Sequence, residues 1–189
     1  MTEALHRLKT EHGRIRAMLA QFEAQLDLFE QAEQPDYEIL GGSVAYCREY
    51  LDCWHHARED ALLERLHERD PEAAHQCAEL EAQHAGLADV TRELVAIFEA
   101  VREGATVERE RLVGRARKLA KAYHLHLAWE EEHFFPVVEK ALRPEDWAAI
   151  DARFAAVDDP LATNPVDERY RPLFGAIIDA CITCAKSST

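Results

Sequence analysis

The sequence predicts an all-α fold: an up-down-up-down four-helix bundle with a short C-terminal helical appendage. Four long stretches place apolar residues at alternating spacings of three and four, which is typical of bundled helices. Only 7 Gly and 7 Pro occur in 189 residues, and the links between the stretches are a few residues long. We therefore expect the bundle over residues 1–142, and C-terminal helices over 143–189 that pack on it in the same domain.

The first two helices are expected over residues 2–30 and 36–68, with Pro35 suited to the turn that precedes the second. The apolar face of the first is Leu5, Leu8, His12, Ile15, Leu19, Phe22, Leu26 and Phe29. That of the second is Val44, Cys47, Leu51, His55, Glu59, Leu62 and Leu66. Both faces therefore carry histidine where a bundle normally has an apolar residue.

The third and fourth helices are expected over residues 71–103 and 106–142. Asp70 is a suitable N-cap before Pro71, and Gly104 is expected to end the third helix. The third apolar face is Ala73, Cys77, Leu80, His84, Leu87, Thr91, Leu94, Phe98 and Val101. The fourth is Leu112, Ala116, Leu119, Tyr123, His126, Glu130, His133, Val137 and Ala141. These two faces carry histidine as well.

Two shorter helices are expected after residue 142. The first opens at Pro144 and presents Trp147, Ile150 and Phe154 on one face. A loop follows over 158–167. The stripe of the second helix is Tyr170, Phe174, Ile177, Cys181 and Cys184, so we expect it to pack on the bundle with both cysteines as packing residues.

One histidine from each long helix falls at the same depth in the bundle. His12 lies 21 residues before a turn centred near Glu33, and His55 lies 22 residues after it. The corresponding counts to His84 and then to His126 differ by one and two residues. At about 1.5 Å of rise per residue, these differences amount to only ~1.5–3 Å. The sequence therefore predicts one layer of inward-facing imidazoles.

Two acids belong to the same layer. Glu59 follows His55 by four residues and Glu130 follows His126 by four, which places each pair on one helix face. His56 with Asp60 is the alternative pair on the second helix. We favour His55 with Glu59 because Leu51, Leu62 and Leu66 share their face. His56 is left open as an outer residue or an additional ligand.

Other histidines and acids are excluded from the layer. His133 and His6 lie roughly 9–13 Å from the layer along their helices, and His124 has the right depth but lies off the face. Glu131 and Glu132 are expected on a solvated face. The predicted metal ligands are therefore His12, His55, Glu59, His84, His126 and Glu130.

Buried carboxylates are costly unless they are paired or bound to a metal. Six ligands exceed the four that zinc prefers, and they suit two first-row ions that share carboxylate bridges. Imidazole together with carboxylate favours iron or manganese over calcium. The layer therefore predicts a site for two metal ions.

The composition restricts the partners. The chain has 22 Lys and Arg against 36 Asp and Glu, a formal charge of −14, so nucleic acids and anionic membranes are poor candidates. No apolar run approaches the length of a membrane span, and the amphipathic N-terminus lacks an apolar signal region. Five cysteines without a disulfide pattern indicate reduced thiols. We expect a cytoplasmic protein; its oligomeric state is left open.

The chain resembles the hemerythrin-like, or HHE cation-binding, family over about residues 6–142. The matching pieces are Glu11-His12, then His55-His56-Ala57-Arg58-Glu59-Asp60, then Gln83-His84, and finally His126 with Glu130-Glu131 and Phe135-Pro136. The resemblance implies two non-haem iron ions with an oxo or hydroxo bridge, and Glu59 and Glu130 as bridging carboxylates. Relatives bind or sense oxygen, respond to nitric oxide, reduce peroxide or repair iron–sulfur clusters.

The sequence departs from oxygen-carrying hemerythrins on the third helix. Those proteins place a second histidine one turn from the first, whereas the neighbours of His84 at that spacing are Leu80 and Ala88. We therefore expect an open coordination position on that side of the site, and we do not infer reversible oxygen carriage.

Three functions remain open from the sequence. The first is a metal-binding protein that binds or senses oxygen, nitric oxide or peroxide, and that would need a protein partner for signal output. The second is a stress-response di-iron enzyme that handles peroxide or nitric oxide or delivers iron. The third is a bundle with a redox-silent ion or none. No catalytic residue is assigned.

Overall fold

The computed structural model describes residues 2–187, and the side chains of residues 2–183. All regular structure in this range is helical, so the predicted all-α class is confirmed. The helical segments in chain order are α1 (Glu3–Glu30), α2 (Tyr37–Tyr46), η1 (Cys47–His55), α3 (His56–Arg69), α4 (Pro71–Gln76), α5 (Glu79–Arg102), α6 (Arg109–Trp129), η2 (Glu130–Phe134), α7 (Phe135–Ala141), α8 (Pro144–Phe154), η3 (Glu168–Tyr170) and α9 (Arg171–Ser187).

Several predicted helix ends agree with the structure. Asp70 caps α4, since its Oδ1 accepts a hydrogen bond from the Ala73 N–H at 3.0 Å. Gly104 follows the end of α5 with a φ of +91°, a backbone conformation that side chains disfavour. The third predicted helix differs near its start, where it is interrupted at residues 77–78 between α4 and α5. The fourth begins at Arg109 rather than at residue 106.

Two segments are wound as π-helix, and both adjoin the predicted ligands. The segment η1 ends at His55, and η2 begins at Glu130. A π-turn holds more residues than an α-turn, so it rotates the following side chains relative to a regular α-helix. All seven residues of the inward face predicted for the second helix are buried, and His56 is buried beside them.

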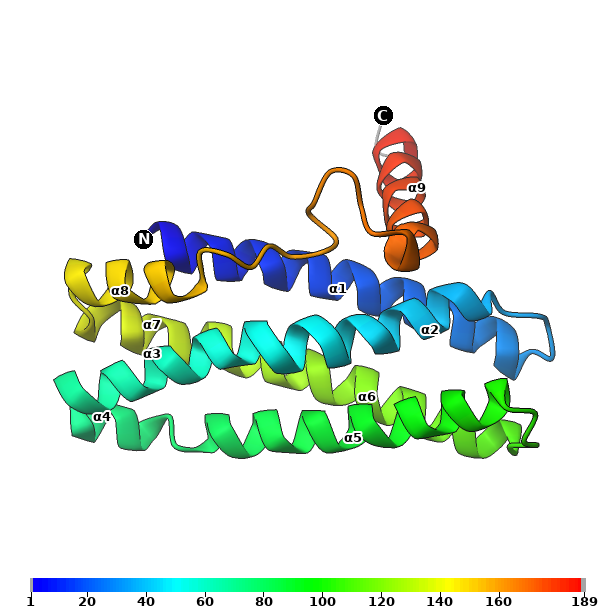
Figure 1. Cartoon of the computed structure of the whole chain (residues 1–189), viewed down its shortest axis with the longest axis horizontal. Coiled ribbons are helices and arrows are strands. Elements are labelled where there is room, and N and C mark those ends of the chain that lie inside the picture. The colour runs from blue at the N-terminus through cyan, green and yellow to red at the C-terminus, as the bar shows by residue number, and fades with distance from the viewer. Residues whose placement is uncertain (1, 188–189) are drawn as a thin grey trace.

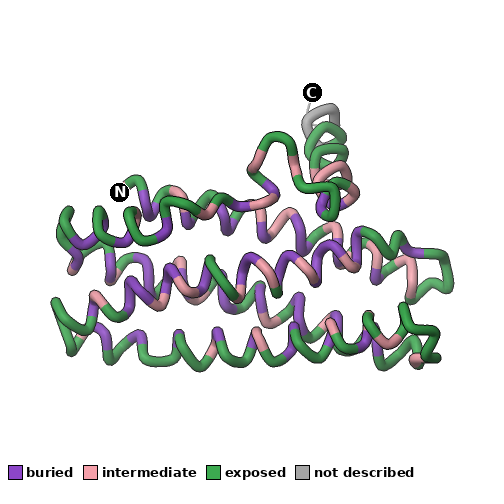
Figure 2. Tube along the Cα trace, in the orientation of Figure 1, coloured by how far each residue is buried: buried purple, intermediate pink, exposed green. Residues whose placement is uncertain are grey.

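The long helical segments form columns that lie side by side along the long axis of the molecule (Figure 1). They consist of α1, then α2 with η1 and α3, then α4 with α5, and finally α6 with η2 and α7. Helix α6 contacts both α1 and α5, and the second column contacts α1 and α5. Buried residues follow the inner faces of the columns (Figure 2). None of the described helices is long and apolar enough to cross a bilayer.

The apolar core is divided into two clusters. One contains Leu19 of α1 and Leu94 of α5, and the other contains Leu5 of α1 and Leu62 of α3. The predicted histidine and glutamate positions fall between the two clusters in all of these columns. A buried polar layer therefore separates the two halves of the core.

The two C-terminal helices differ in how closely they pack on the bundle. Trp147, Ile150 and Phe154 of α8 are buried in the core, as predicted. Helix α9 contacts α1 and α2 near its start and then projects away from the bundle (Figure 1). Ile178 and Ile182 are 41% and 47% exposed.

The prediction that the whole stripe of the last helix packs on the bundle is therefore wrong for its second half. Cys181 is exposed and is not a packing residue. The side chain of Cys184 lies outside the described residues.

Candidate metal centre

The structure brings the six predicted ligand residues together in one buried layer. Oε1 of Glu59 lies 3.4 Å from Nε2 of His12 and 3.3 Å from Nε2 of His55. Its other oxygen lies 3.5 Å from Nε2 of His84. Glu130 completes the layer, with oxygens 3.4 Å from Nε2 of His12, 3.6 Å from that of His84 and 3.3 Å from that of His126. The depth deduced from the turns is therefore correct.

Each of the four imidazoles is held from outside by a hydrogen bond at Nδ1. The acceptors are Glu131 for His12 at 3.0 Å, Glu11 for His55 at 2.8 Å, Asp60 for His84 at 2.7 Å and Gln83 for His126 at 3.0 Å. An acceptor outside the ring favours the tautomer in which Nδ1 carries the proton. Nε2 then presents a lone pair to the interior, which is the arrangement that histidine ligands of metals usually have.

Nε2 of His12 lies within hydrogen-bond distance of Oε1 of Glu59, at 3.4 Å. The other inward-facing atoms of the six residues lack hydrogen-bond partners among the described residues. They are Nε2 of His55, His84 and His126, Oε2 of Glu59, and both carboxylate oxygens of Glu130. Buried polar groups without partners cost about 1–3 kcal/mol each, and more when they are charged. Nitrogen and oxygen lone pairs that face one another need a cation between them, and the residues present fit a metal ion.

The pKa values of the two buried carboxylates shift in opposite directions in the ion-free protein. Burial and the neighbouring Glu59 raise the pKa of Glu130 to about 8. Burial also disfavours the charge of Glu59, but His55 and the other imidazoles outweigh it and hold the pKa of Glu59 well below its usual value. A cation bound between the two acids would remove their mutual repulsion.

The imidazoles divide into two kinds. Burial opposes the charged form of His84, yet its hydrogen bond to Asp60 and the nearby carboxylates of Glu130 and Glu59 outweigh burial and raise its pKa to about 11. Burial lowers the pKa of His126 to about 3, so that ring is neutral. His84 therefore holds a proton that a metal ion would have to displace.

A buried arginine supports the second column of the site. Arg58 is only 1% exposed, and its guanidinium donates to both oxygens of Glu11 at 3.1 and 3.0 Å. Glu11 in turn accepts the hydrogen bond from His55. The same guanidinium lies 5.4 Å from the ring centre of Phe154 in α8. Helix α8 therefore covers the outside of the layer at His55.

The sequence analysis identified none of the four outer partners, and it gave two of them other places. Glu131 was expected on a solvated face, but it accepts from His12 and forms two hydrogen bonds with Arg16 at 2.8 and 2.9 Å. Asp60 was considered as a partner of His56, but it contacts His84 on the neighbouring column. Residue counts from the turns give the depth of such residues, but they do not show which neighbouring helix the side chains contact.

The histidines excluded from the layer are exposed in the structure, so the prediction that His133 lies on the inward face of the fourth helix is wrong. His124 lies 3.1 Å from Glu23, and His133 stacks on Trp129 with ring centres 5.6 Å apart. His56, which the sequence left open, is buried beside the layer.

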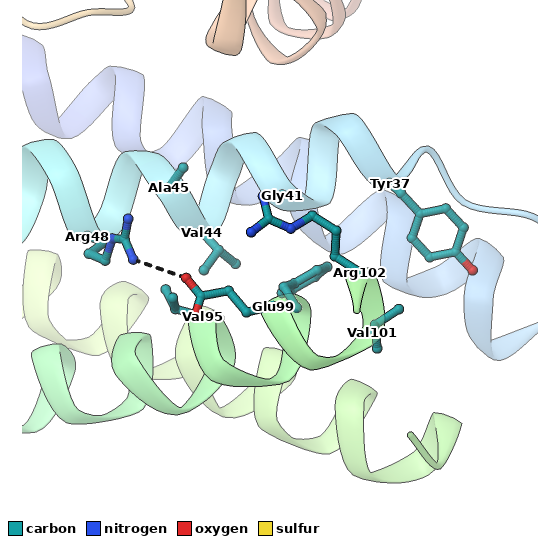
Figure 3. Close-up of a pocket in the computed structure, with 10 residues that line it drawn as sticks. Tyr37, Gly41, Val44, Ala45, Arg48, Val95, Glu99, Val101 and Arg102 are labelled. Atoms are coloured by element: carbon teal, nitrogen blue, oxygen red, sulfur yellow. Dashed lines mark ion pairs between the residues drawn. The ribbon is translucent and has the colours of Figure 1, made fainter. Parts of the chain in front are cut away.

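An apolar surface groove lies elsewhere (Figure 3). It has a volume of about 430 Å³ between α2 and the end of α5, and Arg48 and Glu99 form an ion pair across it at 3.7 Å. Arg48 precedes His55 by seven residues, about 10 Å along the helix axis. The groove contains no group of metal-ligating side chains.

The family model described as hemerythrin HHE cation binding domain matches residues 3–138. The chain belongs to this family. Searches of curated proteins and of solved structures found no match. Hemerythrin domains bind metal cations, and the polar layer of this hemerythrin-like chain supplies buried groups that could hold them. Its ligand atoms form two groups, one with His12, His55 and Glu59, and the other with His56, Glu59, His84 and His126.

Proposed function

We propose that this chain holds a pair of iron ions in the polar layer of an up-down-up-down four-helix bundle, with Glu59 and Glu130 as bridging carboxylates. The observation that carries this proposal is the set of buried nitrogen and oxygen lone pairs that converge without a hydrogen-bond donor. Glu59 belongs to both groups of ligand atoms, as a carboxylate shared by two ions would. Histidine and carboxylate ligands suit iron in helical bundles.

The proposed function is to bind or sense a small oxidant or gas such as oxygen, nitric oxide or peroxide. The two iron ions would supply the redox chemistry and the site at which the small molecule binds. The chain supplies the rest: Glu11, Asp60, Gln83 and Glu131 orient the imidazoles, and complete burial of His12, Glu59 and Glu130 excludes bulk water. A site enclosed in this way favours molecules of a few atoms over larger substrates.

Anaerobic loading with ferrous iron tests the proposal. Metal analysis after desalting should give about two ions per chain, since the layer offers two groups of ligands. A stoichiometry that stays at or below one would contradict the two-ion site. Titration of the loaded protein with oxygen, nitric oxide and peroxide should then change its absorption spectrum without turnover. Sustained consumption of peroxide would instead assign the protein to the enzymes.

A further inference from the structure

His56 adjoins the six ligand residues and has no assigned role among them. It begins α3 directly after the π-helical segment, and it is 3% exposed. Its ring stacks on that of His84 with centres 4.3 Å apart and an angle of 13°. The ring of His126 lies 5.3 Å away at 88°. His56 therefore lies against the side of the layer formed by the third and fourth columns.

One nitrogen of His56 lies near a carboxylate, and the other is buried without a partner. Nδ1 faces outward, 3.6 Å from Oδ1 of Asp52. Nε2 is buried and has no hydrogen-bond partner among the described residues. A histidine that served only to position its neighbours would use Nε2 in a hydrogen bond, because an unpartnered buried nitrogen costs about 1–3 kcal/mol.

The distances allow Nε2 of His56 to share an ion with its neighbours. One ligand atom each from His56, Glu59, His84 and His126 lie within 4.8 Å of one another. Two ligand atoms on opposite sides of a metal ion with bonds of about 2.0–2.2 Å lie up to ~4.4 Å apart. The group closes when the ring of His56 turns out of its stack on His84, because one ion cannot lie in the planes of two parallel rings.

We propose that His56 is a fifth imidazole ligand, bound to the same ion as His84 and His126, an inference that rests on the proposed two-ion site. The other ion then has His12 and His55, and the two ions differ by one imidazole. The expected open position beside Leu80 and Ala88 is filled from the neighbouring column. The exchangeable position belongs to the ion on His12 and His55.

The test compares wild-type protein with His56→Ala after anaerobic loading with ferrous iron. The variant should lose one of two ions, or bind the second at least ~10-fold more weakly. His124→Ala is the matched control, because His124 lies at the same depth but outside the bundle, beside Glu23. It should retain both ions with wild-type affinity. Helical content by circular dichroism should be the same for all three proteins.

Imidazole added to His56→Ala distinguishes a ligand from a packing residue. Free imidazole should restore the second ion, and ¹⁵N-labelled imidazole should give a ¹⁵N coupling to the half-reduced iron pair in pulsed electron paramagnetic resonance. If His56→Ala does not fold, His56→Gln, which keeps a polar side chain of similar length, is loaded instead and should show the same loss of the second ion.

The outcomes separate the two proposals. Wild-type protein that binds fewer than two ions would overturn the two-ion site itself. Wild-type protein with two ions, together with a His56 variant of unchanged affinity, would overturn only the role of His56. Restoration by imidazole without a ¹⁵N coupling would also overturn it, because the ring would then merely fill space.

Discussion

Glu130 and His84 each hold a proton near neutral pH when no metal is bound. The pKa of Glu130 is raised to about 8 by burial and by Glu59, and the carboxylates near His84 raise its pKa to about 11. Both groups are therefore protonated at pH 7, whereas a metal ion binds only the deprotonated carboxylate and the free Nε2 lone pair. The layer binds either protons or metal ions.

Metal loading at pH 7 is accordingly expected to release protons, and the apparent affinity should rise with pH through about 8. The sign follows from the raised pKa values, since fewer protons compete as the pH increases. Calorimetry in buffers of different ionisation enthalpy measures the number released. A loading heat that is the same in every buffer would contradict this expectation.

Glu130→Ala should lose at least one ion while the protein remains helical. The reason is that Glu130 contributes both carboxylate oxygens to the layer and contacts imidazoles of three columns. Glu132→Ala is the control, because Glu132 is exposed two residues away. Metal analysis and circular dichroism provide the measurements, and retention of both ions by Glu130→Ala would exclude a bridging role.

The sequence was sufficient to locate the six layer residues, but it did not identify their outer partners. Depth depends only on residue counts from the turns, and an error of one residue moves a side chain by about 1.5 Å. The partner of a histidine depends instead on the rotation and neighbour of each helix. Asp60 shows the difference, since it lies four residues after His56 in the chain and yet bonds His84 on another column.

At the scale of elements, the π-helical segment η1 explains why His55 and His56 are not alternatives on the second column. A regular helical period permits one inward face, so His55 and His56 were treated as alternatives. The π-turns that end at His55 change the rotation between successive residues, and both side chains are buried. No simple sequence signal in η1 marks this change of winding.

Helix α9 is attached to the bundle through close packing at Gly42. A Cβ atom added to Gly42 would lie 3.5 Å from the carbonyl oxygen of Arg169 and 3.7 Å from Cβ of Leu173. An alanine therefore fits, but a larger side chain must displace η3 and α9. Overpacking of this kind typically costs about 1–3 kcal/mol.

Gly42→Leu should loosen α9 without affecting the metal layer. Hydrogen exchange should become faster over residues 168–177, and the iron content should remain that of the wild type. Gly41→Leu is the matched control, since an added Cβ at Gly41 meets no atom within 4 Å. Loss of iron from Gly42→Leu would show that the attachment of α9 and the layer are coupled.

At the scale of the whole molecule, the columns are joined by two apolar clusters with the polar layer between them. The clusters exclude water from both ends of the layer, and the side chains of His12, Glu59 and Glu130 have no exposed surface. These residues come from three columns, and His12 lies 119 residues before Glu131 in the chain.

Complete enclosure also governs how fast a metal ion arrives. A hydrated cation cannot pass between closely packed helices, so uptake must wait for a transient opening of the bundle. The rate of ferrous iron uptake in stopped-flow measurements should therefore level off as the iron concentration rises, at the opening rate of the protein. Low concentrations of urea should increase that limiting rate by favouring the open form. A rate that grows in proportion to iron concentration without limit would instead require an entrance that is always open.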